Sequence, residues 1–467
     1  MSELFVDLLP YLIALGRCIF AVVFVMQILP MLIWAERKGA AYIQDRPGPN
    51  RAHVFGIRAA GLVHTLNDVV KLIMKEDIIP GHVEKRYWAA APVIAMSVAL
   101  CTFIVVPFGD NFMGYDLKVS DIDGGLLFVL AATGMGVYGV MLAGWASNNK
   151  FSLLGGLRAS AQMVSYELSM GLSAVVVFLL AGSVSLSTIA EMQAGGLWNW
   201  TFFTPIGFVA FVLFWTAAFA ETNRTPFDLP EGEAELVGGY HTEYSSLRFA
   251  LFFMAEYANM IVASAVTATL FFGGYNTGIV TTAWLREHAD WVLVAAAGAV
   301  PVLLWFAYEA NKRKQRPFYQ ALPAGDARLK EPMLFVGVWL GAAVAHLAIG
   351  VAGLMGVASK LSLDFATLGM MSGVFDSVGM SHETQTAVFG PDLVTAIVGI
   401  TVLAVKVLFG CWFFIWVRWT VPRFRYDQLM DLGWKRMLPL ALGNVMLAAV
   451  WVAMFPTGLL STLFGSK

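Results

Sequence analysis

The run Gly125-Leu-Leu-Phe-Val-Leu-Ala-Ala-Thr-Gly-Met-Gly-Val-Tyr-Gly-Val-Met-Leu-Ala-Gly-Trp145 decides the fold class, because its 21 residues include no charged side chain. About 20 apolar residues in an α-helix span the hydrocarbon core of a bilayer. Other apolar runs of this kind occur along the whole chain. We therefore predict an all-α polytopic membrane protein with about ten transmembrane helices, at roughly 9–34, 88–108, 125–145, 163–181, 205–220, 249–273, 291–309, 333–357, 392–417 and 437–460.

The composition of the chain agrees with this prediction. Of its 467 residues, 58% are hydrophobic and 13% are charged, whereas soluble domains have about 45–50% apolar and about 25% charged residues. The formal net charge of −2 gives no basic surface for a nucleic acid. These values exclude a water-soluble enzyme, a disordered chain and a nucleic-acid-binding protein.

The distribution of Lys and Arg predicts the orientation, because cytoplasmic loops carry an excess of these residues. With the N-terminus outside, the inner loops contain 24 of the 30 basic residues. The outer loops and the C-terminus then contain only Lys118, Arg286, Lys360 and Lys467. This distribution predicts an even number of crossings, with both termini on the outer side. Residues 1–10 contain no Lys or Arg, so we expect a retained first helix rather than a cleaved signal.

The first inner loop contains an amphipathic segment. Apolar side chains recur at helical spacing and a polar set occupies the opposite face, which is typical of a helix lying in the membrane interface. The alternative is a loop helix that only anchors the inner surface. The apolar face is Leu62, Leu66, Val69, Val70 and Ile73, and the polar face is His64, Asn67, Asp68, Lys71 and Lys75.

We single out three acids and one lysine that fall within or at the end of predicted spans, namely Glu167, Glu221, Glu256 and Lys406. Each such group costs on the order of 3 kcal/mol at bilayer depth and is usually functional. We therefore expect a proton or ion path. The alternative is a set of structural ion pairs, for example between Lys406 and one of the glutamates.

The inner loop after the fifth span is acidic, with six carboxylates against two basic residues, Arg224 and Arg248. This ratio is the reverse of the usual preference for basic cytoplasmic loops. Clustered carboxylates raise one another's pKa, which suits proton uptake near neutral pH. The alternative is an ordinary solvated loop. The acids are Glu221, Asp228, Glu231, Glu233, Glu235 and Glu243.

The sequence predicts no metal or nucleotide on this chain. Cys18, Cys101 and Cys411 lie in apolar runs and cannot form a four-cysteine iron–sulfur site, and the histidines lack a ligand spacing. Gly134-Met-Gly-Val-Tyr-Gly139 matches a dinucleotide fingerprint. The match lies inside an apolar span, where glycines allow helices to pack closely, so we interpret it as a packing surface.

Several stretches, in this order along the chain, resemble the H subunit of bacterial NADH–quinone oxidoreductase, respiratory complex I, the counterpart of mitochondrial NADH dehydrogenase subunit 1. They are Ala35-Glu-Arg-Lys-Gly, Asp45-Arg-Pro-Gly-Pro-Asn-Arg, Leu72-Ile-Met-Lys-Glu-Asp, Ala143-Gly-Trp-Ala-Ser-Asn-Asn-Lys-Phe-Ser-Leu-Leu-Gly-Gly-Leu-Arg-Ala-Ser-Ala-Gln, Ser165-Tyr-Glu, Pro226-Phe-Asp-Leu-Pro-Glu-Gly-Glu-Ala-Glu-Leu, Gly239-Tyr-His-Thr-Glu-Tyr-Ser and Pro422-Arg-Phe-Arg-Tyr-Asp-Gln-Leu-Met.

The resemblance implies a multi-pass subunit of the bacterial inner membrane. Such a subunit forms part of the ubiquinone chamber and the start of the proton path. It implies that quinone is the substrate, that FMN and the iron–sulfur clusters belong to partner subunits of complex I, and that this chain binds no cofactor itself. By the family pattern, Glu36, Arg37, Arg46 and Asp68 line the quinone cavity. The loop acids Glu231, Glu233 and Glu235 couple quinone reduction to the chain of carboxylates at Glu167, Glu221 and Glu256.

One part of the chain departs from the resemblance. We predict a family core of eight helices in residues 1–275 and 392–467, and an inserted segment at 276–391 with two further helices and no counterpart in the family. Two other functions stay open. A related membrane subunit of an energy-converting hydrogenase would keep the fold and change the electron donor. A stand-alone ion antiporter would transport ions without partners.

Overall fold

The computed structural model describes residues 2–55, 57–112, 115–120, 122–230, 232, 236–320, 331–355 and 389–454. Most of these residues lie in helices. Two strands of two residues each, β1 (Asn111–Phe112) and β2 (Tyr115–Asp116), form one antiparallel pair. The helices are α1 (Ser2–Ile43), α2 (Leu62–Met74), α3 (Lys85–Cys101), α4 (Gly125–Ala146), α5 (Lys150–Ala181), α6 (Leu186–Met192), α7 (Pro205–Glu221), α9 (Ser246–Phe271), α10 (Thr282–Glu287), α11 (Ala289–Gln320), α12 (Glu331–Leu354), α15 (Phe389–Thr420), α16 (Tyr426–Asp431) and α17 (Leu438–Met454).

Each of the ten predicted spans falls on a helix, which confirms the all-α polytopic class. Among the described residues, eight helices are long and apolar enough to cross a membrane. The shorter apolar helix α7 and the 24-residue helix α12 account for the other two predicted spans. The helix α5 begins earlier than predicted, at Lys150, because the Asn149 side chain accepts a hydrogen bond from the Phe151 N–H and caps it.

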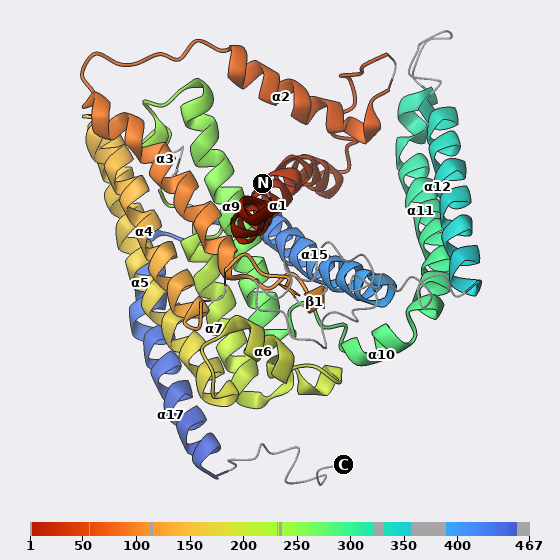
Figure 1. Ribbon diagram of the computed structural model, residues 1–467. Helices are drawn as coiled ribbons and strands as arrows, with labels where there is room; N and C mark the ends of the chain where they lie inside the picture. The colour runs from red at the N-terminus through yellow and green to blue at the C-terminus, as the bar shows by residue number, and fades with distance from the viewer. Residues whose placement is uncertain are drawn as a thin grey trace.

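Glycines allow α3, α4 and α5 to pack closely side by side (Figure 1). A Cβ at Gly139 of α4 would lie 3.0 Å from the Ala95 backbone nitrogen of α3. A Cβ at Gly144 would lie 2.5 Å from the Ser152 carbonyl oxygen of α5. Neither contact is possible for a larger residue without moving a backbone. The interpretation of the Gly134–Gly139 run as a helix-packing surface is therefore confirmed for Gly139.

The amphipathic helix α2 lies across one end of the bundle, and α6 and α10 lie at the opposite end (Figure 1). Its apolar side chains Leu66, Val70 and Ile73 are all more than half exposed. Its C-terminal end is fixed to the start of α9, because Ser246 Oγ donates a hydrogen bond to the carbonyl oxygens of Leu72 and Lys75. An exposed apolar face suits a helix that lies in the membrane interface, and this location of α2 stays a prediction.

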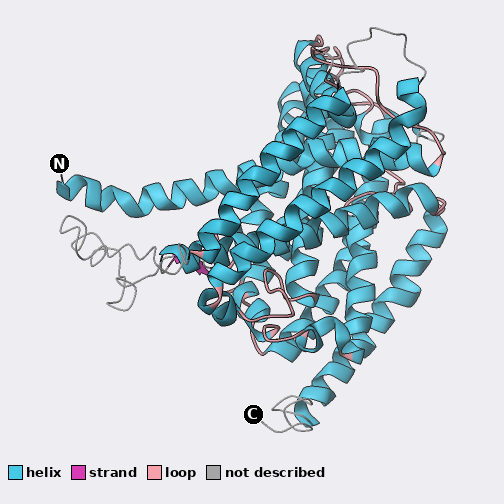
Figure 2. Cartoon of the chain, turned by 90° about the vertical axis from the view of Figure 1, so that its right-hand side faces the viewer, coloured by secondary structure: helices cyan, strands magenta, loops and turns pink. Residues whose placement is uncertain are grey.

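The helices α11 and α12 pack against each other and stand apart from α3, α4 and α5, on the far side of α15 (Figure 1). A cluster of ion pairs fixes the preceding helix α10 to the rest of the chain. Arg286 of α10 lies 3.3 Å from an Asp110 carboxylate oxygen and 3.1 Å from an Asp392 carboxylate oxygen at the start of α15. The first half of α1 extends beyond the bundle (Figure 2).

Candidate functional site

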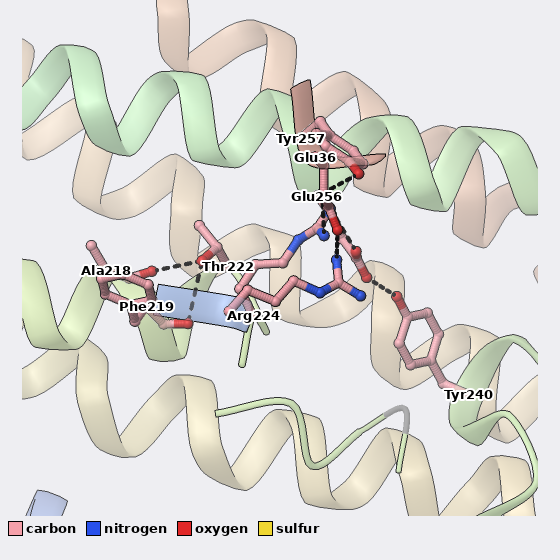
Figure 3. Close-up of polar contacts among 9 residues, drawn as sticks. Glu36, Ala218, Phe219, Thr222, Arg224, Tyr240, Glu256 and Tyr257 are labelled. Atoms are coloured by element: carbon pink, nitrogen blue, oxygen red, sulfur yellow. Dashed lines mark hydrogen bonds and ion pairs between the residues drawn. The ribbon is translucent and has the colours of Figure 1, made fainter. Parts of the chain in front are cut away.

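The guanidinium of Arg224 lies between two carboxylates from different helices (Figure 3). Its Nη1 is 3.4 Å from Glu36 Oε2 of α1, and its Nη2 is 3.5 Å from Glu256 Oε2 of α9. Only 3% of the Arg224 side chain is exposed, and the side chains of Glu36 and Glu256 are 9% and 10% exposed. The stretch 222–224 that brings Arg224 here follows directly after α7, so the site joins three elements that are distant in sequence.

Further side chains complete this Arg224 cluster, which we define as Glu36, Arg224, Tyr240, Glu256, Tyr257 and Arg418 (Figure 3). Arg418 Nη1 of α15 lies 2.6 Å from Glu36 Oε1, and the Tyr257 hydroxyl donates to Glu36 Oε2. The Tyr240 hydroxyl donates to Glu256 Oε1 at 3.0 Å. The Tyr257 ring faces the Arg224 guanidinium at 4.2 Å, in cation–π geometry.

The cluster balances two guanidinium groups against two carboxylates. Burying a charge is costly unless it is paired and hydrogen-bonded, and removing one partner leaves the other uncompensated. Arg224 is therefore the shared cationic partner of Glu36 and Glu256, so a change at either carboxylate alters the contacts of the guanidinium with the other. The structure thus brings together a residue expected at the quinone cavity and one expected on the proton path.

The sequence reasoning missed Arg224, Arg418, Tyr240 and Tyr257 as members of this cluster. A signal was present, because two intramembrane or near-membrane acids require cationic partners and Arg224 lies within the acidic loop. Arg418 was counted only as one of the basic residues of an inner loop. Nothing in the sequence indicated which acid each arginine would meet.

The other predicted quinone-cavity residues lie nearby on α1, α2 and the loop between them. Arg37 pairs with Asp68 across α1 and α2. That these residues line a quinone cavity stays a prediction. The Arg46 guanidinium instead donates to Gln44 Oε1 at 2.7 Å, on the exposed part of the loop. The structure therefore brings Arg37 and Asp68 together and leaves Arg46 outside that pair.

The side chains of Glu167 and Glu221 both lie beside α4, near residues 133 and 134. The Glu167 carboxylate occupies the space beside Gly134, where a Cβ would lie 2.6 Å from Glu167 Oε1. Glu221 lines a cavity of about 30 Å³, together with Thr133 of α4 and Asn259 of α9. Its Oε2 has no hydrogen-bond partner among the described residues. A cavity of this size has room for about two waters, and these side chains supply polar partners for them.

The acidic loop is described only in part. Asp228 is buried and pairs with Arg423 at 2.7 Å, which fixes the loop to the segment after α15. Glu231, Glu233 and Glu235 lie outside the described residues. Their role in coupling stays a prediction.

Lys406 lies on α15 with its ammonium at the end of α9. Its Nζ donates to the carbonyl oxygens of Phe272, Gly274 and Asn276 at 2.7, 2.8 and 2.6 Å. A Lys ammonium has three N–H donors, and these three carbonyls accept from all of them. Cations are favourable at helix C-termini, where carbonyl oxygens lack helical partners. Among the described residues these partners are backbone carbonyls and not a glutamate, so they differ from the ion pair considered as the alternative. A place for Lys406 on the proton path stays a prediction.

A family model described as NADH dehydrogenase matches residues 16–314 and 333–449 of this chain. The chain belongs to the NADH dehydrogenase family.

Several curated members of this family are similar over most of their length. The NADH-quinone oxidoreductase H subunit numbered 2 of Koribacter versatilis is 36% identical over 457 residues, which cover 95% of this chain and 98% of the relative. The H subunit of Leptospira biflexa is 38% identical over 436 residues, 91% of this chain and 90% of the relative. NADH-quinone oxidoreductase subunit 8 of Rhodothermus marinus is 39% identical over 428 residues, 91% of this chain and 93% of the relative.

The family match corrects one expectation. We predicted that residues 276–391 have no counterpart in the NADH dehydrogenase family, but the match includes 276–314 and continues from 333. Within that segment only 315–332 lies outside the match, so the prediction is wrong for the matched residues. The physical reason for the error is that α11 and α12 are ordinary apolar helices without motif residues, and an apolar helix carries little family-specific sequence. The division of the chain into a core and an inserted helix pair remains a prediction.

Proposed function

We propose that this chain is a membrane subunit, of the H type, in a proton-pumping NADH–quinone oxidoreductase. The names of its relatives at 36–39% identity and its membership of the NADH dehydrogenase family support this function. The single structural observation that carries it is the position of Arg224 between Glu36 and Glu256. The flavin and the iron–sulfur clusters then belong to partner subunits, and this chain supplies part of the quinone chamber.

The Arg224 cluster supports a coupling mechanism. Reduction of a quinone adds electrons, supplied by partner subunits, and takes up an equal number of protons. Until those protons are delivered, the cavity that we propose beside Glu36 carries additional negative charge. A change in charge at Glu36 weakens or strengthens its ion pair with Arg224. The Arg224 guanidinium then moves closer to Glu256 or further from it. The ionised Glu256 carboxylate then gains or loses part of the stabilisation that an adjacent cation provides. Chemistry at the quinone thus alters a proton site on α9.

We propose that the proton path continues from Glu256 to Glu221 and Glu167. The cavity beside Glu221 supports this order, because its lining includes Asn259, one helical turn after Glu256 on α9. We propose that Glu231, Glu233 and Glu235 deliver protons from the inner loop and that Asp228 fixes that loop. For Lys406, the three carbonyl bonds favour a role in fixing the end of α9.

We propose a location in the bacterial inner membrane with both termini on the outer side. The inner loops would then contain most of the basic residues and face the hydrophilic subunits, and α2 would lie on that face against lipid headgroups. Cysteines placed at Thr242 and Gln315 should react with an impermeant reagent only from the inside. Labelling of Gln315 from the outside would contradict this topology.

The direct test of the proposed function is co-purification. An affinity-tagged chain, extracted from native membranes in mild detergent, should carry with it flavin- and iron–sulfur-containing subunits and should oxidise NADH with quinone. Co-purification with hydrogenase subunits would instead establish the alternative of a related complex that uses another electron donor. Ion transport by the purified chain alone would establish a stand-alone antiporter, an alternative that the names of the relatives do not favour.

A further inference from the structure

His64 of α2 accepts hydrogen bonds from two consecutive backbone N–H groups of the loop between α1 and α2. Its Nε2 lies 3.1 Å from the Arg51 nitrogen and 3.0 Å from the Ala52 nitrogen. A ring nitrogen accepts hydrogen bonds only when it carries no proton. Both bonds therefore require a neutral imidazole, and protonation of His64 replaces two attractive contacts with a repulsive arrangement of three donors.

The surroundings of His64 favour the neutral form. Burial lowers the pKa of the imidazole below its ordinary value, Asp68 opposes this shift, and the cations Arg37 and Lys38 of α1 lower the pKa further. Asp68 lies one turn along α2 and is itself paired with Arg37. Protonation of His64 would thus add a cation beside two existing cations and would compete for the one carboxylate.

Side chains of α1 hold other parts of the same loop. The Trp34 indole N–H donates to the Ala60 carbonyl at 3.0 Å, and Lys38 Nζ donates to Pro47 O and Asn50 Oδ1. These bonds join the loop to α1. The two bonds at His64 instead join residues 51 and 52 to α2. Their loss would therefore loosen that part of the loop from α2 while the bonds to α1 persist.

We propose that His64 is a positioning residue whose neutral imidazole fixes the α1–α2 loop to α2 and releases it when a proton binds. The His64 contact, defined as its two hydrogen bonds to Arg51 and Ala52, then sets where α2, and with it the Asp68 partner of Arg37, lies relative to α1. This inference rests on the proposed function only where it connects α2 to quinone reduction. The contact itself is a property of the fold.

The sign of the pH dependence follows from the lowered pKa. Because the folded protein binds the proton less readily than the unfolded chain, the His64 contact stabilises the loop above the ordinary histidine pKa. The stabilisation is lost as the pH falls through the lower pKa of the folded state. The loop is therefore expected to open on acidification and not on alkalinisation.

Amide hydrogen exchange in the assembled complex, reconstituted in nanodiscs, tests the contact directly. Protection of the peptide that contains residues 51 and 52 is measured at pH 7.5 and 5.5 and corrected for the intrinsic pH dependence of exchange. Wild-type protection should fall severalfold and by no more than about tenfold, because pH 5.5 lies only about one unit below the ordinary histidine pKa and linkage limits the effect to that size. His64→Gln provides an acceptor oxygen that does not titrate in this range and should keep its protection at both pH values. His64→Ala should be unprotected at both.

A second histidine serves as a matched control. His288→Gln makes the same replacement at the opposite end of the molecule, next to α10, and should retain the wild-type fall in loop protection. An equal fall in His64→Gln, or no fall in the wild type, would overturn the proposal.

Quinone reductase turnover of the same samples separates this inference from the proposed function. If α2 shapes the quinone site, His64→Gln should keep its turnover further into the acid range than the wild type, and His64→Ala should lose turnover at neutral pH. A change in protection with identical pH profiles of turnover would support the contact and overturn its connection to quinone chemistry. Failure of the chain to assemble with quinone-reducing partners would overturn the proposed function while the exchange result still stands.

Discussion

Arg224 and Glu256 are joined by a buried ion pair of 3.5 Å, and the same guanidinium reaches Glu36 at 3.4 Å. The two glutamates belong to α9 and α1, and no local sequence relationship connects them. One side chain therefore links the first helix of the molecule, beside the predicted quinone cavity, to the helix that carries an intramembrane acid. The chemistry that we propose for the chain depends on this link.

Replacement of Arg224 should damage both stability and activity. Arg224→Met leaves two buried carboxylates without their shared cation, and breaking a buried ion pair costs about 3–5 kcal/mol. Arg224→Lys keeps the charge but not the planar group that contacts both acids at once. We expect thermal unfolding of the complex at a lower temperature in Arg224→Met, and quinone reductase activity reduced in both variants.

A double-mutant cycle shows whether the Arg224 effect passes through Glu256. In the Arg224→Met background, Glu256→Gln removes a carboxylate that has already lost the Arg224 guanidinium, so it should cost much less stability and activity than it does alone. Additive losses in the double variant would mean that the two residues act independently, contrary to the structure.

A substitution at Gly134 can displace the Glu167 carboxylate without altering Glu167 itself. Gly134→Ala places a Cβ 2.6 Å from Glu167 Oε1, so the carboxylate must move. We expect proton pumping to fall while the complex still assembles. Gly171→Ala on α5 is the matched control, because a Cβ there meets nothing within 4 Å and alanine is compatible with a helix. Equal pumping in the two variants would remove Glu167 from the path.

The acidic loop is tested by the triple change Glu231→Gln, Glu233→Gln and Glu235→Gln. Glutamine keeps the size of each side chain and removes its negative charge and its exchangeable proton. Assembly should survive, and quinone-linked turnover should fall together with pumping. Turnover equal to that of the wild type would indicate that this stretch is an ordinary solvated loop without a role in coupling.

Lys406→Met distinguishes a structural role from a place on the proton path. The change removes three charge-assisted hydrogen bonds to the end of α9, each worth about 1.5–3 kcal/mol before the relief of burying a charge is counted. We expect a lower unfolding temperature with pumping per turnover retained. The opposite result, full stability with lost pumping, would indicate that Lys406 lies on the proton path.

The sequence predicted the parts of this fold that depend on local composition. Uncharged runs such as 125–145 identified the spans, and the periodicity of 62–73 identified α2, because both signals lie within one element. The start of α5 was placed too late, since Lys150 and Arg158 suggested a loop, although Asn149 before them is a recognisable helix cap.

The candidate site could be predicted only residue by residue. Glu36 and Glu256 were each singled out, but their meeting at Arg224 depends on how α1, α9 and the segment after α7 pack together. Contacts between residues so distant in sequence leave no periodic signal. The same limit explains why Arg418 was counted as a loop cation and why the carbonyl partners of Lys406 were not foreseen.

The measurement that tests the central claim most directly is the number of protons pumped per NADH oxidised by inverted membrane vesicles containing Glu256→Gln. Removing this carboxylate takes away one of the two acidic partners of the buried Arg224, so a purely structural Glu256 predicts lower stability with full pumping per NADH oxidised. The coupling account predicts that the variant assembles and that pumping is lost. Full pumping in assembled Glu256→Gln complex would contradict it.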